Sequence, residues 1–200
     1  GLHTLRGSIS IIPQIPVVFS GSIRRNLDPF GKKTEQDLWK VLEEVNLKNY
    51  VEKLEQRLET DMGSSQQIFS VGQKQLICLA RAILKESKII VLDEATANVD
   101  YETDIFIQKT IMEKFAACTV FTIAHRLSTI ANYNKILVMD KGVLAEFEEP
   151  YKLLVESIGD EKITKNGLFA SVVENTGEAA STHIFRVAKE SFLQRHDIEK

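Results

Sequence analysis

The stretch Ile89-Ile90-Val91-Leu92-Asp93-Glu94 decides the fold, because four apolar residues run directly into two carboxylates. An apolar run of this length is typical of a buried strand. In α/β proteins, ligands bind where such strands end. Buried ions are costly unless a cation or another ligand meets them. One interpretation is therefore a ligand site; the other is that the carboxylates only stabilise the N-terminus of the next helix.

The two carboxylates also fit phosphoryl chemistry. In P-loop enzymes that hydrolyse nucleoside triphosphates, the first carboxylate at such a position helps to hold Mg²⁺, and a following glutamate can polarise the attacking water. This interpretation makes Asp93 a metal residue and Glu94 the general base. Asp93 and Glu94 by themselves support this catalytic interpretation and the helix-capping interpretation equally.

Further strands are predicted on both sides of this stretch. Residues 119–123 (TVFTI) and 135–139 (KILVM) are apolar and rich in β-branched residues, and helical patterns separate the three runs. Strand, helix, strand at this spacing predicts one parallel, buried sheet. Residues 8–12 (SISII) predict another buried strand, which Pro13 stops and whose end presents Gln14.

The segments around the sheet contain a predicted hairpin and several predicted helices. Residues 140–142 (DKG) form a tight turn that leads into residues 143–147. Residues 34–37 resemble a helix-opening capping arrangement, and residues 48–54 predict a second helix. A longer helix after Ser70 presents an apolar face made of Leu76, Leu79, Ala80, Ile83 and Leu84.

A second chemical signal lies at the start of that longer helix, in Ser70-Val71-Gly72-Gln73. Backbone N–H groups and the positive end of a helix dipole suit a phosphate. The alternative is an ordinary helix N-terminus, with Ser70 as a nearby cap and Gly72 easing the turn. Only the surrounding motifs favour the first interpretation.

These motifs resemble the nucleotide-binding domain of ABC transporters. Residues 69–76 (FSVGQKQL) resemble the ABC signature, and residues 93–100 (DEATANVD) resemble the Walker B motif and the D-loop that follows it. Gln14 lies after a strand, as in the Q-loop, and His125 in TIAHRL (122–127) resembles the switch histidine. Few proteins carry these motifs in this order and spacing.

Two stretches narrow the resemblance to subfamily C, the multidrug-resistance-associated proteins. They are residues 19–30 (FSGSIRRNLDPF) and residues 96–100 (TANVD). The valine at position 71 of the signature resembles the signature of the second nucleotide-binding domain in this group. The resemblance covers about residues 1–175 and leaves the tail after Thr176 less diagnostic.

The resemblance implies an α/β fold, the P-loop NTPase (RecA-like) parallel sheet core, incomplete at its N-terminus and carrying a helical ABC-specific subdomain. We expect a partial nucleotide-binding domain over residues 1–175, with the helical subdomain at about 20–86 and the catalytic core at about 87–157. Residues 176–200 are expected to form an amphipathic C-terminal tail.

The resemblance also implies a role for each site residue, with ATP and Mg²⁺ as cofactors. Asp93 orders the metal, which Gln14 also senses; Glu94 activates water, and His125 contacts the γ-phosphate. The expected nucleotide-binding residues are Ser70, Val71, Gly72, Gln73, Asp93 and Asp100. Of these, Ser70, Gly72 and Gln73 are expected to serve the nucleotide held by the opposite domain.

The sequence departs from the family pattern at three points. Ile15 stands where a glutamate often follows the Q-loop glutamine, and Val71 replaces the first signature glycine. No Gly-x-x-x-x-Gly-Lys-Ser/Thr occurs in the 200 residues, and Gly31-Lys32-Lys33 lacks both the upstream glycine and the hydroxyl. We therefore expect a fragment that lacks Walker A and is inactive alone.

Composition limits the partners. The net charge of −3 is spread in both signs, without the basic stripe that strong nucleic-acid binding needs. No run approaches the roughly 18 to 20 apolar residues that cross a bilayer, so this segment is not expected to span a membrane. Cys78 and Cys118 lack metal-ligand spacing and predict buried free thiols in a reducing compartment.

The resemblance implies two kinds of partner, the other nucleotide-binding domain and the transmembrane domains of the same transporter. It also implies a location at the cytoplasmic face of the plasma membrane. The expected function is ATP-driven export of organic anions or drugs. Alternatives are a nucleotide-gated regulatory domain of an ABC-type channel, a soluble ABC ATPase, or a gene remnant that folds poorly. Glu94 and His125 argue against the first alternative, and residues 26–30 argue against the second.

Overall fold

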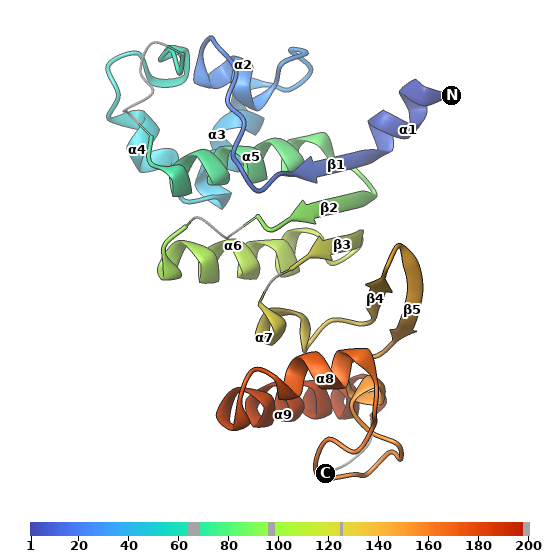
Figure 1. The fold of residues 1–200 in the computed structure, drawn as a ribbon. Coiled ribbons are helices and arrows are strands. Elements are labelled where there is room, and N and C mark those ends of the chain that lie inside the picture. Colours follow the sequence, from blue (N-terminus) through green and yellow to red (C-terminus); the bar gives the residue numbers. More distant parts are fainter. Residues whose placement is uncertain (64–68, 96–98, 125, 198–200) are drawn as a thin grey trace. The chain divides into compact units, whose positions relative to one another are not determined.

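The computed structural model describes residues 1–63, 69–95, 99–124 and 126–197. They form two compact units, Gly1–Ile123 and Ala124–Lys200, which are described separately (Figure 1). Three predicted features lie wholly or partly outside the described residues: the D-loop at 96–98, His125, and the C-terminal tail at 198–200.

The first unit is built on a three-stranded parallel sheet. Its order is β1 (Ile9–Ile12), β2 (Ile89–Asp93) and β3 (Thr119–Ile123), so the predicted strands at its two edges and centre are confirmed (Figure 1). Ile12 pairs with Leu92, and Leu92 pairs with Thr122. Because the strands are parallel and in register, their carboxyl ends share one edge of the sheet.

The two faces of this sheet differ in burial. Ile12, Ile90 and Leu92 are buried in the core, and α5 packs against β1. Side chains alternate between faces along a strand. Accordingly, Ile11 and Phe121 point the other way and are more than half exposed.

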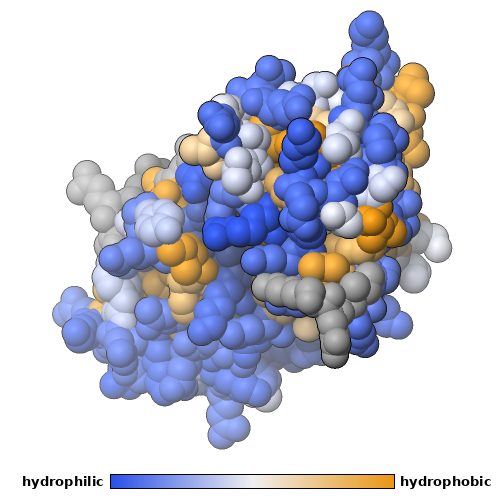
Figure 2. All heavy atoms as spheres, turned by 90° about the horizontal axis from the view of Figure 1, so that it is seen from below, coloured by the Kyte–Doolittle hydropathy of each residue, from blue (hydrophilic) through white to orange (hydrophobic). Residues whose placement is uncertain are grey.

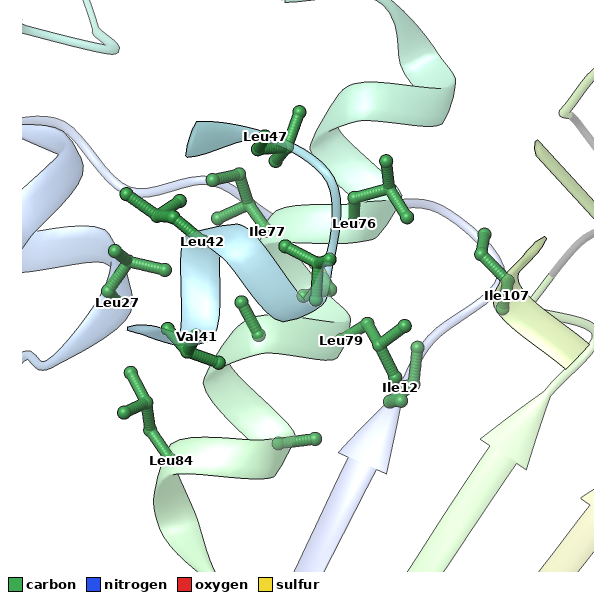
Figure 3. Close-up of a cluster of buried hydrophobic side chains, with 14 of the residues drawn as sticks. Ile12, Leu27, Val41, Leu42, Leu47, Leu76, Ile77, Leu79, Leu84 and Ile107 are labelled. Carbon is green, nitrogen blue, oxygen red and sulfur yellow. The ribbon is translucent and has the colours of Figure 1, made fainter. Parts of the chain in front are cut away.

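Most of the described part of the first unit outside the sheet is helical. Its helices are α1 (Leu2–Ser8), α2 (Ile23–Leu27), α3 (Glu35–Glu44), α4 (Lys48–Glu52), the 3₁₀ helix η1 (Arg57–Glu59), α5 (Val71–Lys85) and α6 (Tyr101–Lys114). Apolar side chains of these helices other than α1 and of the sheet meet in one core, where Leu42, Ile77 and Leu79 are fully buried (Figure 3).

Side-chain caps fix where the longer helices begin. The Thr34 hydroxyl accepts from the Asp37 N–H, and the Asp37 carboxylate accepts from the Thr34 N–H, which confirms the predicted capping arrangement of α3. Ser70 and Gln73 form the same reciprocal box at α5. Asp100 caps α6. Each cap satisfies backbone N–H groups that a helix start leaves without partners.

The second unit packs short elements around its own core. It contains α7 (Leu127–Ile130), β4 (Ile136–Asp140), β5 (Val143–Glu148), the 3₁₀ helix η2 (Tyr151–Leu153), α8 (Leu168–Glu174) and α9 (Glu178–Arg195). Tyr151 and Phe192 are fully buried there, with ring centroids 5.2 Å apart. In the tail, Ile184 and Ala188 are buried on α9.

One predicted strand lies elsewhere than expected. The run at 135–139 was predicted to join the parallel sheet, but β4 pairs antiparallel with β5 in a separate two-stranded sheet. The local turn decides this pairing: Lys141 and Gly142 both have positive φ, as a two-residue hairpin turn requires. The predicted hairpin at 140–147 is confirmed, and the apolar run belongs to it.

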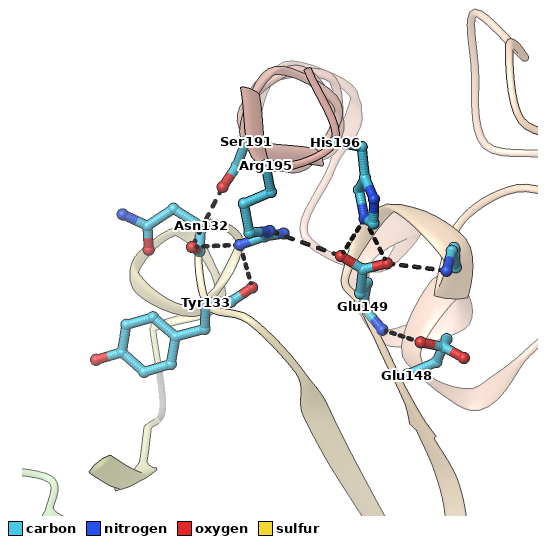
Figure 4. Close-up of polar contacts among 8 residues, drawn as sticks. Asn132, Tyr133, Glu148, Glu149, Ser191, Arg195 and His196 are labelled. Carbon is cyan, nitrogen blue, oxygen red and sulfur yellow. Dashed lines mark hydrogen bonds and ion pairs between the residues drawn. The ribbon is translucent and has the colours of Figure 1, made fainter. Parts of the chain in front are cut away.

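A buried carboxylate links the last turn of α9 to the end of β5 (Figure 4). Glu149 lies 3.0 Å from His196 Nε2 and 2.9 Å from Lys152 Nζ. Arg195 contributes a longer ion pair to Glu149, and its Nη1 donates to the carbonyl oxygens of Asn132 and Tyr133. These contacts attach the C-terminal helix to two other segments of the unit.

The molecular face in Figure 2 is mainly hydrophilic, with hydrophobic side chains in small, separate areas. Scattered apolar side chains of this kind are normal at protein surfaces. No helix in the described part of the chain has the length and apolar character needed to cross a bilayer.

Candidate functional site

Three predicted site residues meet where β1 and β2 end. Asp93 is the last residue of β2, Glu94 follows it, and Gln14 lies two residues beyond β1. The Gln14 amide Nε2 donates a hydrogen bond of 2.8 Å to Glu94 Oε2. Two side chains 80 positions apart in sequence are therefore in direct contact, as neighbouring parallel strands predict.

The backbone at Glu94 is held in an unusual conformation. Its φ of 44° is in the left-handed region, which a residue with a Cβ rarely adopts. Such a residue costs on the order of 1–3 kcal/mol, and residues of this kind cluster at functional sites. The Glu94 N–H donates to the carbonyl of Ile123 at 3.0 Å, so the end of β3 fixes the residue that follows β2.

A second group of predicted residues gathers at the first turns of α5 and α6. Ser70 and Gln73 are tied to each other by the capping box, while Val71 is about half exposed. Gly72 lies against α6: a Cβ there would be 3.3 Å from Thr103 Cγ2 and 3.7 Å from Asp100 Oδ1. The signature glycine therefore permits a close approach between two helix N-termini.

Asp100 is held as an ionised carboxylate. Hydrogen bonds from the Thr103 N–H and then from the Thr103 hydroxyl lower the pKa of Asp100 below its ordinary value. The carboxylate is exposed at the start of α6. It therefore adds negative charge beside the N-terminus of α5 at neutral pH.

The geometry separates the alternatives that the sequence left open. The helix after Glu94 is capped by Asp100, so Asp93 and Glu94 do not serve as its cap. At α5 the capping interpretation describes the structure, because Ser70 is the cap. Phosphate binding at Ser70 and Gly72 stays a prediction, and His125 lies outside the described residues.

The donor atoms at the strand ends suit a hard cation. Carboxylate and amide oxygens are ligands that Mg²⁺ accepts, and Mg²⁺ is usually held by one or two carboxylates together with water and phosphate oxygens. Because Gln14 donates through Nε2, its amide oxygen is the atom left for a metal. Within the described residues, no three His, Cys, Asp or Glu side chains form a metal cluster.

One contributor to this site was not predicted from the sequence. Gln75 lies on the buried side of α5, 1% exposed, and its Nε2 donates to the Pro13 carbonyl at 3.0 Å. Its Oε1 has no hydrogen-bond partner among the described residues. An unsatisfied buried acceptor costs about 1–3 kcal/mol. The sequence offered one signal for Gln75: it is a polar residue next to the apolar helix face that includes Leu76 and Leu79.

Sequence comparisons agree with the geometry. Residues 1–97 match the family model described as ABC transporter. ATP-binding cassette sub-family C member 4 of Homo sapiens is 50% identical over 98% of this chain and 14% of its own length. The probable multidrug resistance-associated protein lethal(2)03659 of Drosophila melanogaster is 50% identical over 96% of this chain and 14% of its own length.

A third relative, ATP-binding cassette sub-family C member 3 of Mus musculus, is 48% identical over 90% of this chain and 11% of its own length. The chain thus spans about one seventh of the length of the first two relatives. Residues 1–97 carry ABC transporter domain sequence, the described residues form an α/β fold, and the relatives named above are ATP-binding cassette subfamily C and multidrug resistance-associated proteins.

Proposed function

We propose that this chain is part of the second nucleotide-binding domain of a multidrug-resistance-associated ABC transporter, and that it takes part in binding and hydrolysing ATP to drive export of organic anions or drugs. The contact between Gln14 and Glu94 beside Asp93 carries the proposal. It brings an amide and two carboxylates to one edge of a parallel sheet, where α/β proteins bind ligands.

In this proposal each residue acts through the atoms that the fold presents. Glu94 takes the proton of the attacking water, and Gln14 orients Glu94 through their hydrogen bond. Asp93 and Gln14 would hold Mg²⁺, which would neutralise phosphate charge there. His125 contacts the γ-phosphate.

The residues at the helix starts serve the opposite nucleotide. Ser70, Val71, Gly72 and Gln73 offer the N-terminus of α5, whose partial positive charge favours a phosphate. Asp100 borders that site. The partners are therefore the other nucleotide-binding domain and the transmembrane domains of the transporter, at the cytoplasmic face of the plasma membrane.

The proposed general base is tested by Glu94→Gln in the full-length protein that contains this chain. The amide keeps the size of the side chain but cannot take a proton, and general-base catalysis supplies roughly 10² to 10⁴ in rate. We expect ATP turnover to fall at least about 10²-fold, measured as phosphate release. The control is Glu55→Gln, an exposed carboxylate between α4 and η1. Near-native turnover in Glu94→Gln would remove Glu94 from this role.

We also propose that the 200-residue chain does not hydrolyse ATP alone. Its sequence contains no Gly-x-x-x-x-Gly-Lys-Ser/Thr, the motif whose backbone N–H groups and lysine surround the phosphates. Turnover measurements therefore use the full-length protein.

A further inference from the structure

Three side chains of α5 hold the segment that follows β1. Gln75, Cys78 and Arg81 lie three residues apart along the helix. Gln75 Nε2 donates to the Pro13 carbonyl at 3.0 Å, and Arg81 Nη1 donates to the Val17 carbonyl at 3.1 Å. The Cys78 thiol also lies 3.7 Å from the Val17 carbonyl oxygen. One face of α5 thus satisfies backbone acceptors of residues 13–17, which form no strand or helix of their own.

Gln75 is the member of this row nearest the proposed site. Its acceptor, Pro13, directly precedes Gln14 in the chain, and Gln14 donates to Glu94. A continuous set of contacts therefore runs from α5 through Gln75 and the Pro13 carbonyl to the proposed general base. Gln75 does not touch Glu94 in any described contact, so its influence on Glu94 passes through Gln14.

Among the described residues, the polar contact of Gln75 is made by its donor group and not by its acceptor. Gln75 is buried, and its Oε1 has no hydrogen-bond partner in the described part of the chain. A buried acceptor without a partner is destabilising, whereas an apolar side chain of the same size would have no such atom. The polar atom of Gln75 that makes a hydrogen bond is Nε2, which donates to the Pro13 carbonyl.

We propose that Gln75 is a positioning residue, which fixes Gln14, and through it Glu94, relative to the helix that begins at the signature motif. This inference rests on the proposed function. The same helix starts at Ser70, Gly72 and Gln73, so one helix carries both the proposed nucleotide-binding N-terminus and the side chain that bonds to the Pro13 carbonyl. A displacement of α5 is transmitted to Gln14 through the Gln75 hydrogen bond.

The test replaces Gln75 by methionine in the full-length protein, because methionine keeps the length of the side chain and removes both polar atoms. Hydrogen exchange of the backbone amides at residues 14–19, apart from Pro16, is measured without nucleotide. We expect this exchange to become faster in Gln75→Met, while thermal stability falls less than in the control Leu79→Ala, because the substitution removes an unsatisfied acceptor together with the donor to Pro13. The turnover number for ATP is expected to fall about 3- to 10-fold, the loss of one hydrogen bond, with KM unchanged.

The matched control is Leu79→Ala, one turn further along the same helix and fully buried. It creates a cavity and lowers thermal stability. If general loosening of α5 were responsible, Leu79→Ala would reproduce the exchange pattern at residues 14–19; we expect it not to do so.

Two outcomes overturn the inference. The first is exchange at residues 14–19 in Gln75→Met that matches the unchanged protein. The second is faster exchange with an unchanged turnover number, which would leave Gln75 without an effect on the reaction. The exchange measurement needs no ATP, so it decides the contact even if Glu94→Gln disproves the proposed hydrolysis.

Discussion

At the scale of single residues, two glutamates show how surroundings change the chemistry of a carboxylate. Glu94 is only partly buried, and its Oε2 accepts a hydrogen bond from the uncharged amide of Gln14. Glu149 is buried between basic groups, with Lys152 and His196 both within 3.0 Å. The cations beside Glu149 favour its ionised form.

Glu149 is expected to make the stability of the second unit depend on pH. Burial of Glu149 acts to raise its pKa, but hydrogen bonds from Lys152 and His196 outweigh burial and lower the pKa below its ordinary value. Because the pKa is lowered in the folded state, Glu149 stabilises the fold at pH values above its unfolded pKa of about 4.3. This stabilisation is lost as the pH falls through the folded-state pKa. We expect Glu149→Gln to lower the free energy of unfolding at pH 7. We also expect this free energy to fall less steeply in the variant as the pH is lowered, as measured by urea unfolding.

The control for this prediction is Glu161→Gln. Glu161 also pairs with a lysine, Lys189, but its side chain is 87% exposed, and exposed pairs contribute little. Equal effects of the two variants on the acid branch of the stability curve would contradict the role of Glu149.

At the scale of elements, α3 and α5 begin in the same way. Thr34 with Asp37 and Ser70 with Gln73 form two reciprocal capping boxes. Removal of such a cap costs about 1 kcal/mol in either helix. The two helices differ in what the sequence predicts at their first turns: only α5 begins with a signature motif.

This pair gives a matched test of the signature. Ser70→Ala and Thr34→Ala are expected to lower the free energy of unfolding by about 1 kcal/mol each. Only Ser70→Ala is expected to lower ATP turnover in the full-length protein as well. Equal turnover in the two variants would mean that Ser70 serves as a cap and nothing more.

Elements with a local signal were predictable from the sequence, and elements that depend on distant partners were not. The strands at 89–93 and 119–123 and the cap at Thr34 follow from short patterns, and the structure contains them. The run at 135–139 was identified as a strand but placed in the wrong sheet, because apolar character does not name a pairing partner.

The site divides in the same way. Gln14, Asp93 and Glu94 could be proposed because each follows a predicted strand. Gln75 could not, since its role depends on the carbonyl of Pro13, 62 positions away, coming within 3.0 Å. Periodicity marks a buried position on a helix but says nothing of which backbone oxygen lies opposite.

At the scale of the whole molecule, the two units have separate hydrophobic cores. Leu42 belongs to the first core and Phe192 to the second, and both are at most 2% exposed. The two sets of buried residues have no member in common. Each unit therefore has apolar burial of its own to support its fold.

We expect the cores to respond separately to mutation. Leu42→Ala costs about 2–5 kcal/mol and Phe192→Ala about 3–5 kcal/mol by loss of buried area and creation of a cavity. In scanning calorimetry, each variant is expected to move one heat-absorption peak to lower temperature and leave the other in place. A single peak that both variants shift as a whole would show one cooperative fold instead.

Two cores also bear on how such a sequence can change over generations. Proteins keep only a small margin of stability, and most substitutions reduce it. When two regions fold on separate cores, damage in one does not use up the margin of the other. If the two cores unfold separately, substitutions around α8 and α9 are expected to leave the stability of the sheet that presents Gln14, Asp93 and Glu94 unchanged.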